Sequence, residues 1–199
     1  MKTAPFTLNQ KGSDLYFPSD HTAALPLEST SHLGIGAHQD DLEFMAMHGI
    51  LEGYDSEQRW FGGVTCTNGA GSTRSGQFAG VSDEKMQVIR AEEQREAARL
   101  GQYHFVAQLN YPSSQIKEPG FGGLAEDLFR ILQSTQPEVV YTHNLADKHG
   151  THIAVALAAI EAIRRLPLAQ RPRQLIGCEV WRDLDWIPDA DKVVMDLSK

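Results

Sequence analysis

The sequence predicts a single α/β domain in which a mostly parallel β-sheet lies between layers of helices. Short apolar runs alternate along the chain with longer helical stretches, which is typical of repeated strand–helix units. A length of 199 residues is enough for one domain to bury a core of its own. Residues 1–31, which several prolines interrupt, are expected to form an irregular N-terminal arm, and residues 32–199 the folded domain.

The predicted strands are five apolar runs with only weak polar–apolar alternation, a pattern that suits strands buried on both faces. They cover residues 33–37, 60–66, 104–109, 138–142 and 175–181. Strands of this kind belong to parallel sheets, because helices then cover both faces.

Three helices are predicted between these strands, over residues 83–100, 123–135 and 151–165. Ser82 is the expected N-cap of the first helix, and Gly101 follows its last residue. The second helix stops before a proline, and the third becomes basic at its end, as the helix dipole favours.

Composition limits the partners and the location of the protein. The chain has 18 Lys+Arg against 26 Asp+Glu, a net charge of −8, and no basic cluster, so we expect a small-molecule substrate and no nucleic-acid partner. No apolar run is long enough to span a membrane, and the first residues lack a signal-peptide core. Cys66 and Cys178 each lie in an apolar run, which predicts buried free thiols and a reducing, cytoplasmic location. A homo-oligomer is compatible with the sequence.

Two polar clusters follow predicted strands. His38 to Asp41 come directly after one strand, and residues 143–152, with His143, His149 and His152, come after another. The carboxyl ends of parallel strands meet at one edge of a sheet, where ligands bind, so both clusters are expected to face the same site. Imidazole and carboxylate groups are ligands for a divalent ion, and catalytic zinc keeps three protein ligands and one open position.

The alternative is that these residues are ordinary loop and capping residues. Each histidine alone is more often a hydrogen-bonded loop residue, and an Asp pair after a strand is more often a helix cap. The conjunction of both clusters favours the metal site. Of Asp40 and Asp41, one would bind the metal and the other would accept a proton from water, and the spacing leaves the assignment open.

Several segments together are similar to a known family. They are AHQDD at 37–41, TNGAG at 67–71, the pattern RxxExxxAxxLG at 90–101, and DxHxxH at 147–152. With these motifs the chain resembles, over about residues 33–198, the LmbE-like or PIG-L-type N-deacetylases. This family hydrolyses N-acetylglucosamine-containing substrates or related amides with zinc on a Rossmann-like fold.

The resemblance implies a role for each motif residue. His38, Asp41 and His152 would bind Zn²⁺, with another divalent ion such as Fe²⁺ as the alternative. Asp40 would be the general base. His149 would stabilise the tetrahedral intermediate or protonate the departing amine. The expected activity is hydrolysis of a C–N amide bond, most simply the deacetylation of an N-acetylated sugar or a related small molecule.

Further residues are assigned less directly. Asn68, Arg74, His143 and Asp147 are candidate substrate contacts. Arg90 and Glu93 share a helix stripe with apolar residues, which indicates a buried ion pair.

The chain also departs from the family pattern. Gln39 replaces a common proline, and Thr151 stands where many members have an aspartate. Ser113 and Ser114 occupy a region where many members have an aspartate that binds a sugar hydroxyl. A sugar substrate is therefore less firmly implied than amide hydrolysis. The chain also ends where members usually continue, so the domain is expected to lack its usual C-terminal segments.

Two other functions fit parts of the sequence. One is a non-catalytic zinc- or carbohydrate-binding protein of the same fold. The other is an iron(II), 2-oxoglutarate-type oxygenase, because His38, Asp40 and His152 also make a two-His-one-carboxylate set. Such oxygenases have an all-β jelly roll, which the alternation of strands and helices argues against. A nucleotide site is disfavoured because Gly34 and Gly36 lack a third glycine.

Overall fold

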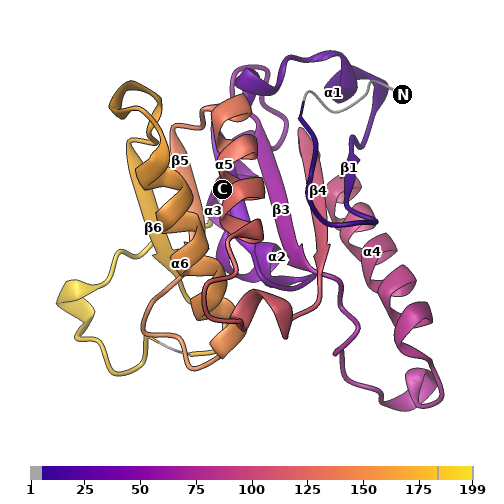
Figure 1. Ribbon diagram of the computed structural model, residues 1–199. Coiled ribbons are helices and arrows are strands. Elements are labelled where there is room, and N and C mark those ends of the chain that lie inside the picture. Colours follow the sequence, from indigo (N-terminus) through magenta and orange to yellow (C-terminus); the bar gives the residue numbers. More distant parts are fainter. Residues whose placement is uncertain (1–5, 183, 199) are drawn as a thin grey trace.

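The computed structural model describes residues 6–182 and 184–198 and confirms the predicted α/β class (Figure 1). Its six strands form one sheet in the order β1-β4-β3-β2-β5-β6, and every neighbouring pair except β1 with β4 is parallel. The strands are β1 (Asp14–Tyr16), β2 (His32–Gly36), β3 (Phe61–Thr67), β4 (Phe105–Tyr111), β5 (Val139–His143) and β6 (Gln174–Cys178). All five predicted strands are present, with shifted ends.

The helices are α1 (Asp20–Ala24), α2 (Asp41–Met45), α3 (Met47–Gly53), α4 (Asp83–Leu100), α5 (Gly123–Thr135) and α6 (Gly150–Arg165). The predicted bounds of α4 and α5 are confirmed, and α6 begins one residue earlier than predicted. Ser82 caps α4 as expected, because its hydroxyl accepts a hydrogen bond from the Lys85 N–H. No helix among the described residues is long and apolar enough to cross a membrane.

The N-terminal arm contains more regular structure than the sequence predicts. It contains β1, α1 and a 3-10 turn (Leu27–Ser29). Strand β1 pairs antiparallel with β4, and Asp14 forms an ion pair with Arg95 of α4 at 2.6 Å. A three-residue strand at the edge of a sheet is too short to show a periodic pattern, which is why the sequence did not reveal it.

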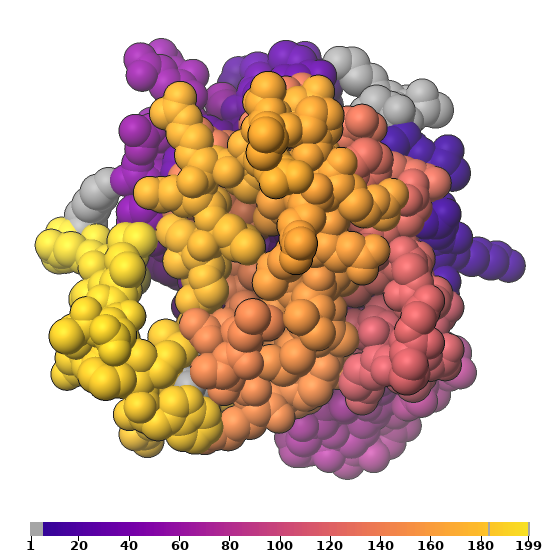
Figure 2. All heavy atoms as spheres, turned by 60° about the vertical axis from the view of Figure 1, so that its left-hand side comes forward, coloured from indigo at the N-terminus to yellow at the C-terminus, as the bar shows by residue number. Residues whose placement is uncertain are grey.

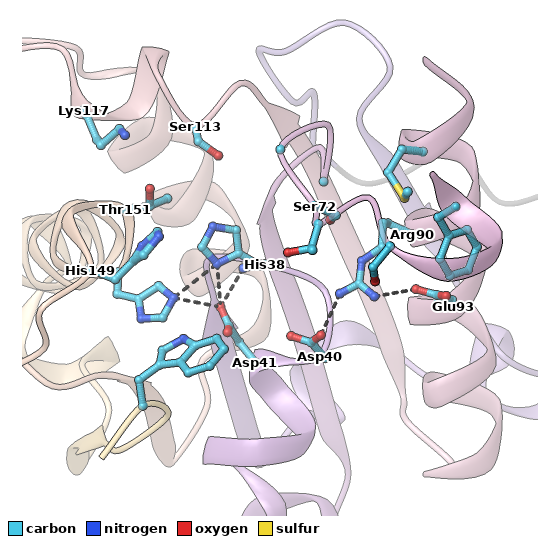
Figure 3. Close-up of a pocket in the computed structure, with 18 residues that line it drawn as sticks. His38, Asp40, Asp41, Ser72, Arg90, Glu93, Ser113, Lys117, His149 and Thr151 are labelled. Atoms are coloured by element: carbon cyan, nitrogen blue, oxygen red, sulfur yellow. Dashed lines mark hydrogen bonds and ion pairs between the residues drawn. The ribbon is translucent and has the colours of Figure 1, made fainter. Parts of the chain in front are cut away.

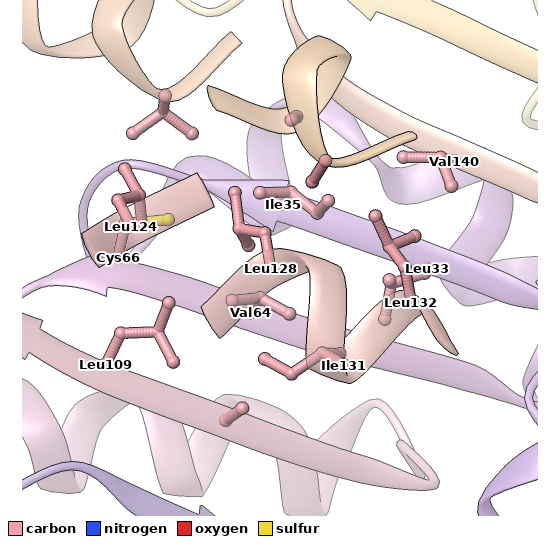
Figure 4. Close-up of a cluster of buried hydrophobic side chains, with 14 of the residues drawn as sticks. Leu33, Ile35, Val64, Cys66, Leu109, Leu124, Leu128, Ile131, Leu132 and Val140 are labelled. Atoms are coloured by element: carbon pink, nitrogen blue, oxygen red, sulfur yellow. The ribbon is translucent and has the colours of Figure 1, made fainter. Parts of the chain in front are cut away.

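Two apolar clusters hold the helices to opposite faces of the sheet. On one face, α5 and α6 pack over β2, β3 and β4, with Leu33, Ile35 and Leu128 among the fully buried side chains (Figure 4). On the other face, α2, α3 and α4 cover Phe61 and Tyr141. Both cysteines are buried and free, as predicted.

The order of the strands creates a crevice between β2 and β5. From β2 the chain passes to β3 and β4 on one side of the sheet, with α2, α3 and α4 on one face. It then returns to β5 and β6 on the other side of β2, with α5 and α6 on the opposite face. In parallel sheets this reversal opens a crevice beyond the carboxyl ends of the two strands, where ligands bind.

The segment that follows β6 lies beside the body of the molecule (yellow in Figure 2). Its Trp186 ring stacks on a cation of the β5–α6 loop, since the Lys148 amine lies 4.1 Å from the ring centroid. Trp181, earlier in the same segment, lines this crevice.

Candidate metal centre

The loop between β2 and α2 carries the residues on one side of the site. Asp40 is the N-cap of α2 and has a left-handed backbone with φ of 85°, which Asp and Asn tolerate better than most residues. Asp41 begins the helix and is 2% exposed. A Cβ on Gly36 would lie 3.1 Å from the Asp41 Cβ, so glycine there lets the start of α2 sit close against the end of β2.

All three predicted metal ligands lie together in the crevice. Figure 3 shows two of them, His38 and Asp41, side by side. The Asp41 Oδ2 atom is 3.4 Å from His38 Nδ1 and 3.7 Å from His152 Nε2, and the two histidine nitrogens are 3.2 Å apart. Tetrahedral zinc with ligands at about 2.0–2.1 Å has ligand atoms about 3.3–3.4 Å from one another. The spacing of His38, Asp41 and His152 therefore fits a zinc-sized ion.

Asp147 fixes the orientation of the His152 ring by a hydrogen bond on the side away from the cluster. The two side chains have no exposed surface, and His152 Nδ1 donates a hydrogen bond to Asp147 Oδ2 at 2.7 Å. Since a carboxylate only accepts, the proton of neutral His152 is on Nδ1, and the lone pair of Nε2 faces the site. Burial, and then the neighbouring His143, lowers the pKa of His152, which favours this neutral form.

A second buried histidine, His143, stands beside this cluster. Its Nε2 atom lies 3.3 Å from Asp41 Oδ2 and accepts a hydrogen bond from the Ala37 N–H at 2.9 Å. Its ring stacks on that of His152 at 3.9 Å. Among the described residues, two further sets are close enough to hold an ion: Asp41 with His143 and His152, and His38 with His149 and His152.

Asp41 carries a negative charge in this setting. Burial by itself raises the pKa of the carboxyl, but the adjacent His143 and then His38 outweigh burial and lower the pKa far below its usual value. The His38 N–H also donates to Asp41 Oδ2 at 2.6 Å. A charged carboxylate is the form that binds a metal ion.

The remaining predicted catalytic residues flank the cluster in a pocket of about 620 Å³. Asp40 and His149 lie on opposite sides of Asp41, and both line the pocket (Figure 3). His149 precedes α6 and is exposed, and partial burial followed by the nearby His38 lowers its pKa.

Arg90 of α4 holds the loop that carries Asp40. Its guanidinium donates to Asp40 Oδ2 at 2.7 Å, to the Gln39 carbonyl at 2.6 Å and to Glu93 Oε2 at 2.5 Å. The predicted Arg90–Glu93 pair exists, but the prediction that it is buried is wrong, because the Glu93 side chain is 46% exposed. This stripe of α4 faces the pocket instead of the core.

Gln39, where a proline is common, has a structural role of its own. Its side chain is buried, and its Nε2 donates to the Thr67 carbonyl at 3.0 Å. This bond joins the loop after β2 to the end of β3, which a proline could not do.

The four residues predicted to contact the substrate do not line this pocket. Arg74 donates to the Ala70 carbonyl at 2.7 Å and pairs with Asp83 at 2.5 Å. The side chain of Asn68 accepts from the Ala70 N–H at 3.1 Å. These two residues therefore hold the loop after β3 in shape. His143 and Asp147 lie beneath the metal cluster with no exposed side-chain surface.

Other residues line the pocket in their place. They include Ser113, Lys117, Thr151 and Trp181. Ser113 and Thr151 were visible in the sequence only as departures from the family pattern. Lys117 and Trp181 gave no signal, because nothing in the chain order relates them to the metal cluster.

The fold and the cluster together define a Rossmann-like α/β protein with a His/Asp candidate metal centre. The chain matches the family PIG-L, described as GlcNAc-PI de-N-acetylase, over residues 33–163 and belongs to this family. No curated protein matches it significantly.

Solved structures share the fold at low sequence identity. N,N'-diacetylchitobiose deacetylase from Pyrococcus horikoshii is 20% identical with a TM-score of 0.60, covering 82% of this chain and 67% of that one. A conserved protein from Thermus thermophilus is 21% identical with a TM-score of 0.55, covering 75% and 66%. The 4-carboxy-2-hydroxymuconate hydratase from Pseudomonas putida is 21% identical with a TM-score of 0.51, covering 74% and 62%. The aligned part thus spans about two thirds of each neighbour's length.

Proposed function

We propose that the protein is a zinc-dependent amide hydrolase that removes an acetyl group from an N-acetylated sugar or a related small molecule. The observation that carries this proposal is the triangle of His38, Asp41 and His152 at the bottom of a pocket flanked by Asp40 and His149. Membership of the PIG-L family supports the deacetylase class, and a diacetylchitobiose deacetylase has a similar fold.

His38, Asp41 and His152 would hold the ion, which, when bound, supplies Lewis-acid activation of water and of the amide carbonyl. Asp40 would accept a proton from the attacking water as the new C–O bond forms. His149 would stabilise the tetrahedral intermediate, or in its protonated form would give a proton to the nitrogen as the C–N bond breaks, leaving a free amine and acetate. Asp40 would then release to solvent the proton that it took from water. The ion pair with Arg90 keeps the Asp40 carboxylate at the edge of the pocket during this sequence.

The test is a panel of N-acetylated sugars and amides, including N-acetylglucosamine and diacetylchitobiose, assayed for free amine and acetate, with metal analysis of the same preparation. Asp40→Asn should keep its metal and lose turnover by about 100-fold or more, since asparagine also tolerates the left-handed backbone. Asp41→Asn is the matched variant and should lose metal as well as activity. Full activity in Asp40→Asn would remove this residue from the base role.

Rival functions predict different outcomes in the same assays. A non-catalytic binding protein would hold zinc and release acetate from no substrate. Because a hydratase has a similar fold, 4-carboxy-2-hydroxymuconate, an unsaturated tricarboxylate, belongs in the panel, and water addition to it without amide hydrolysis would replace our proposal. An oxygenase is disfavoured, since this sheet is mostly parallel and helix-covered, unlike a jelly roll.

A further inference from the structure

One side of the pocket carries polar side chains that form no hydrogen bond or ion pair with the described residues. Ser113, Lys117 and Thr151 line it next to His149, on the side of the metal cluster away from Arg90 (Figure 3). They come from two places in the chain, the β4–α5 connection with its 3-10 turn η3 (Gln115–Lys117) and the first turn of α6.

Thr151 is the most unusual of these groups. The residue is 1% exposed, yet its side chain lines the pocket with its oxygen directed towards Ser113 and Lys117 (Figure 3). No hydrogen bond within the described part of the chain uses its hydroxyl. A hydroxyl that faces the pocket and has no partner among the described residues is available to donate a hydrogen bond to a ligand there.

The start of α6 adds a second favourable group. This helix has 16 residues, and no side chain caps its N-terminus. The free N–H groups of its first turn, at Gly150 and Thr151, lie at the positive end of the helix dipole, which favours an anion.

Lys117 supplies a full positive charge at the same place. Its Cδ atom lies 3.7 Å from where a Cβ on Gly150 would be, so its side chain runs beside the first residue of α6. Across the described residues, no carboxylate forms an ion pair with Lys117. The guanidinium of Arg90, on the other side of the pocket, is already paired with Asp40 and Glu93. Among the described residues that line the pocket, Lys117 is therefore a cation with no ion-pair partner, in a chain whose net charge is −8.

We infer that Lys117, the Thr151 hydroxyl and the start of α6 form a subsite for an anionic group of the substrate, a carboxylate or a phosphate. The inference rests on the proposed function and narrows its substrate to an N-acyl compound that carries such a group near the amide. Ammonium, hydroxyl and backbone N–H groups all donate to the oxygens of an anion, and the charge-assisted bonds are the stronger ones. Lys117 and Thr151 are then residues that determine specificity, and neither takes part in the bond changes.

The test compares matched substrates in wild type, Lys117→Met and Thr151→Val. N-acetylglucosamine and its 6-phosphate form one pair, and an N-acetyl amino acid and its amide form the other. We expect kcat/KM for an anionic member to exceed that of its neutral partner, and Lys117→Met to lower it at least 10-fold while changing the neutral partner less than 2-fold. Lys85→Met, an exposed lysine in the first turn of α4, is the control and should change neither.

Binding provides a readout that does not need turnover. Titration of the metal-loaded Asp40→Asn protein with each substrate pair should show preference for the anionic member, and adding Lys117→Met should remove that preference. Equal effects of Lys117→Met on charged and neutral members, in both assays, would overturn the inference. If amides are hydrolysed but neither pair shows a charge preference, the subsite is wrong and the proposed function stands.

The anion could also be the acetate that the reaction releases. In that case Lys117→Met would relieve inhibition by added acetate and leave the ratio of kcat/KM between charged and neutral substrates unchanged, which would also overturn the inference. Unchanged acetate inhibition together with loss of the substrate preference supports it.

Discussion

The hydrogen bond between Asp147 and His152 offers the sharpest test of how the metal centre is built. Both side chains are fully buried, and Asp147 accepts two bonds, one from His152 Nδ1 at 2.7 Å and one from the His149 N–H at 2.8 Å. In Asp147→Asn one of the two carboxylate oxygens becomes an amide that can only donate. One donor of the pair, His152 Nδ1 or the His149 N–H, then loses its acceptor.

The size of the effect follows from the kind of bond that is lost. A hydrogen bond to a charged group contributes about 1.5–3 kcal/mol. If the histidine bond is the one lost, His152 is no longer held with Nε2 towards His38 and Asp41. Loss of such a supporting carboxylate lowers metal affinity by about 10- to 100-fold, which agrees with that energy.

The assay is competition for zinc between the protein and a chelating indicator at pH 7. Asp189→Asn, which removes an exposed carboxylate paired with Lys192, is the control and should leave affinity unchanged. Urea unfolding of the metal-free proteins separates loss of metal binding from loss of stability. Zinc affinity of Asp147→Asn within 2-fold of wild type, in a folded protein, would show that Asp147 does not orient His152.

Two further predictions concern stability. In Gly49→Ala the new Cβ would lie 2.5 Å from Cε2 of the buried Tyr141 ring, so we expect a loss of about 1–3 kcal/mol in the free energy of unfolding in urea. Gly80→Ala, with nothing within 4 Å, is the control and should stay within about 0.5 kcal/mol of wild type. Burial lowers the pKa of His104 to about 4. Between pH 6.5 and 4, His104 is therefore protonated in the unfolded chain but stays neutral in the folded one, which favours unfolding. Stability should fall by up to about 3 kcal/mol between pH 6.5 and 4, and this part of the loss should be absent in His104→Gln. The same pH dependence in both proteins would contradict the assignment.

Strong local signals made the longer elements predictable. The helices α4 and α5 have the predicted bounds because a Ser82 cap, a regular apolar stripe and a proline after the last turn act through neighbouring residues alone. The expectation that residues 1–31 are irregular was less accurate, because β1 and α1 are three and five residues long. Elements of that length are stabilised by the sheet edge against which they pack.

The metal cluster was predictable for a different reason. Parallel strands in one sheet bring their carboxyl ends together, so the residues after β2 and β5 had to meet once the α/β class was known. Chain order therefore placed His38, Asp41 and His152 near one another. Chain order did not reveal that Asp147 binds His152 instead of the substrate. Both residues belong to the same short motif, and only the directions of their side chains show which one faces the pocket.

The rest of the pocket depends on tertiary structure. Lys117 and Thr151 are far apart in the chain, and they share one side of the pocket because η3 packs against the start of α6. Arg90 reaches Asp40 because α4 packs on the same face of the sheet as α2, opposite to α5 and α6. Periodicity and capping act over a few residues, so the sequence alone determines the class of fold and the position of the predicted metal ligands. The packing of distant segments, which depends on the shape of the whole core, decides which charges surround them.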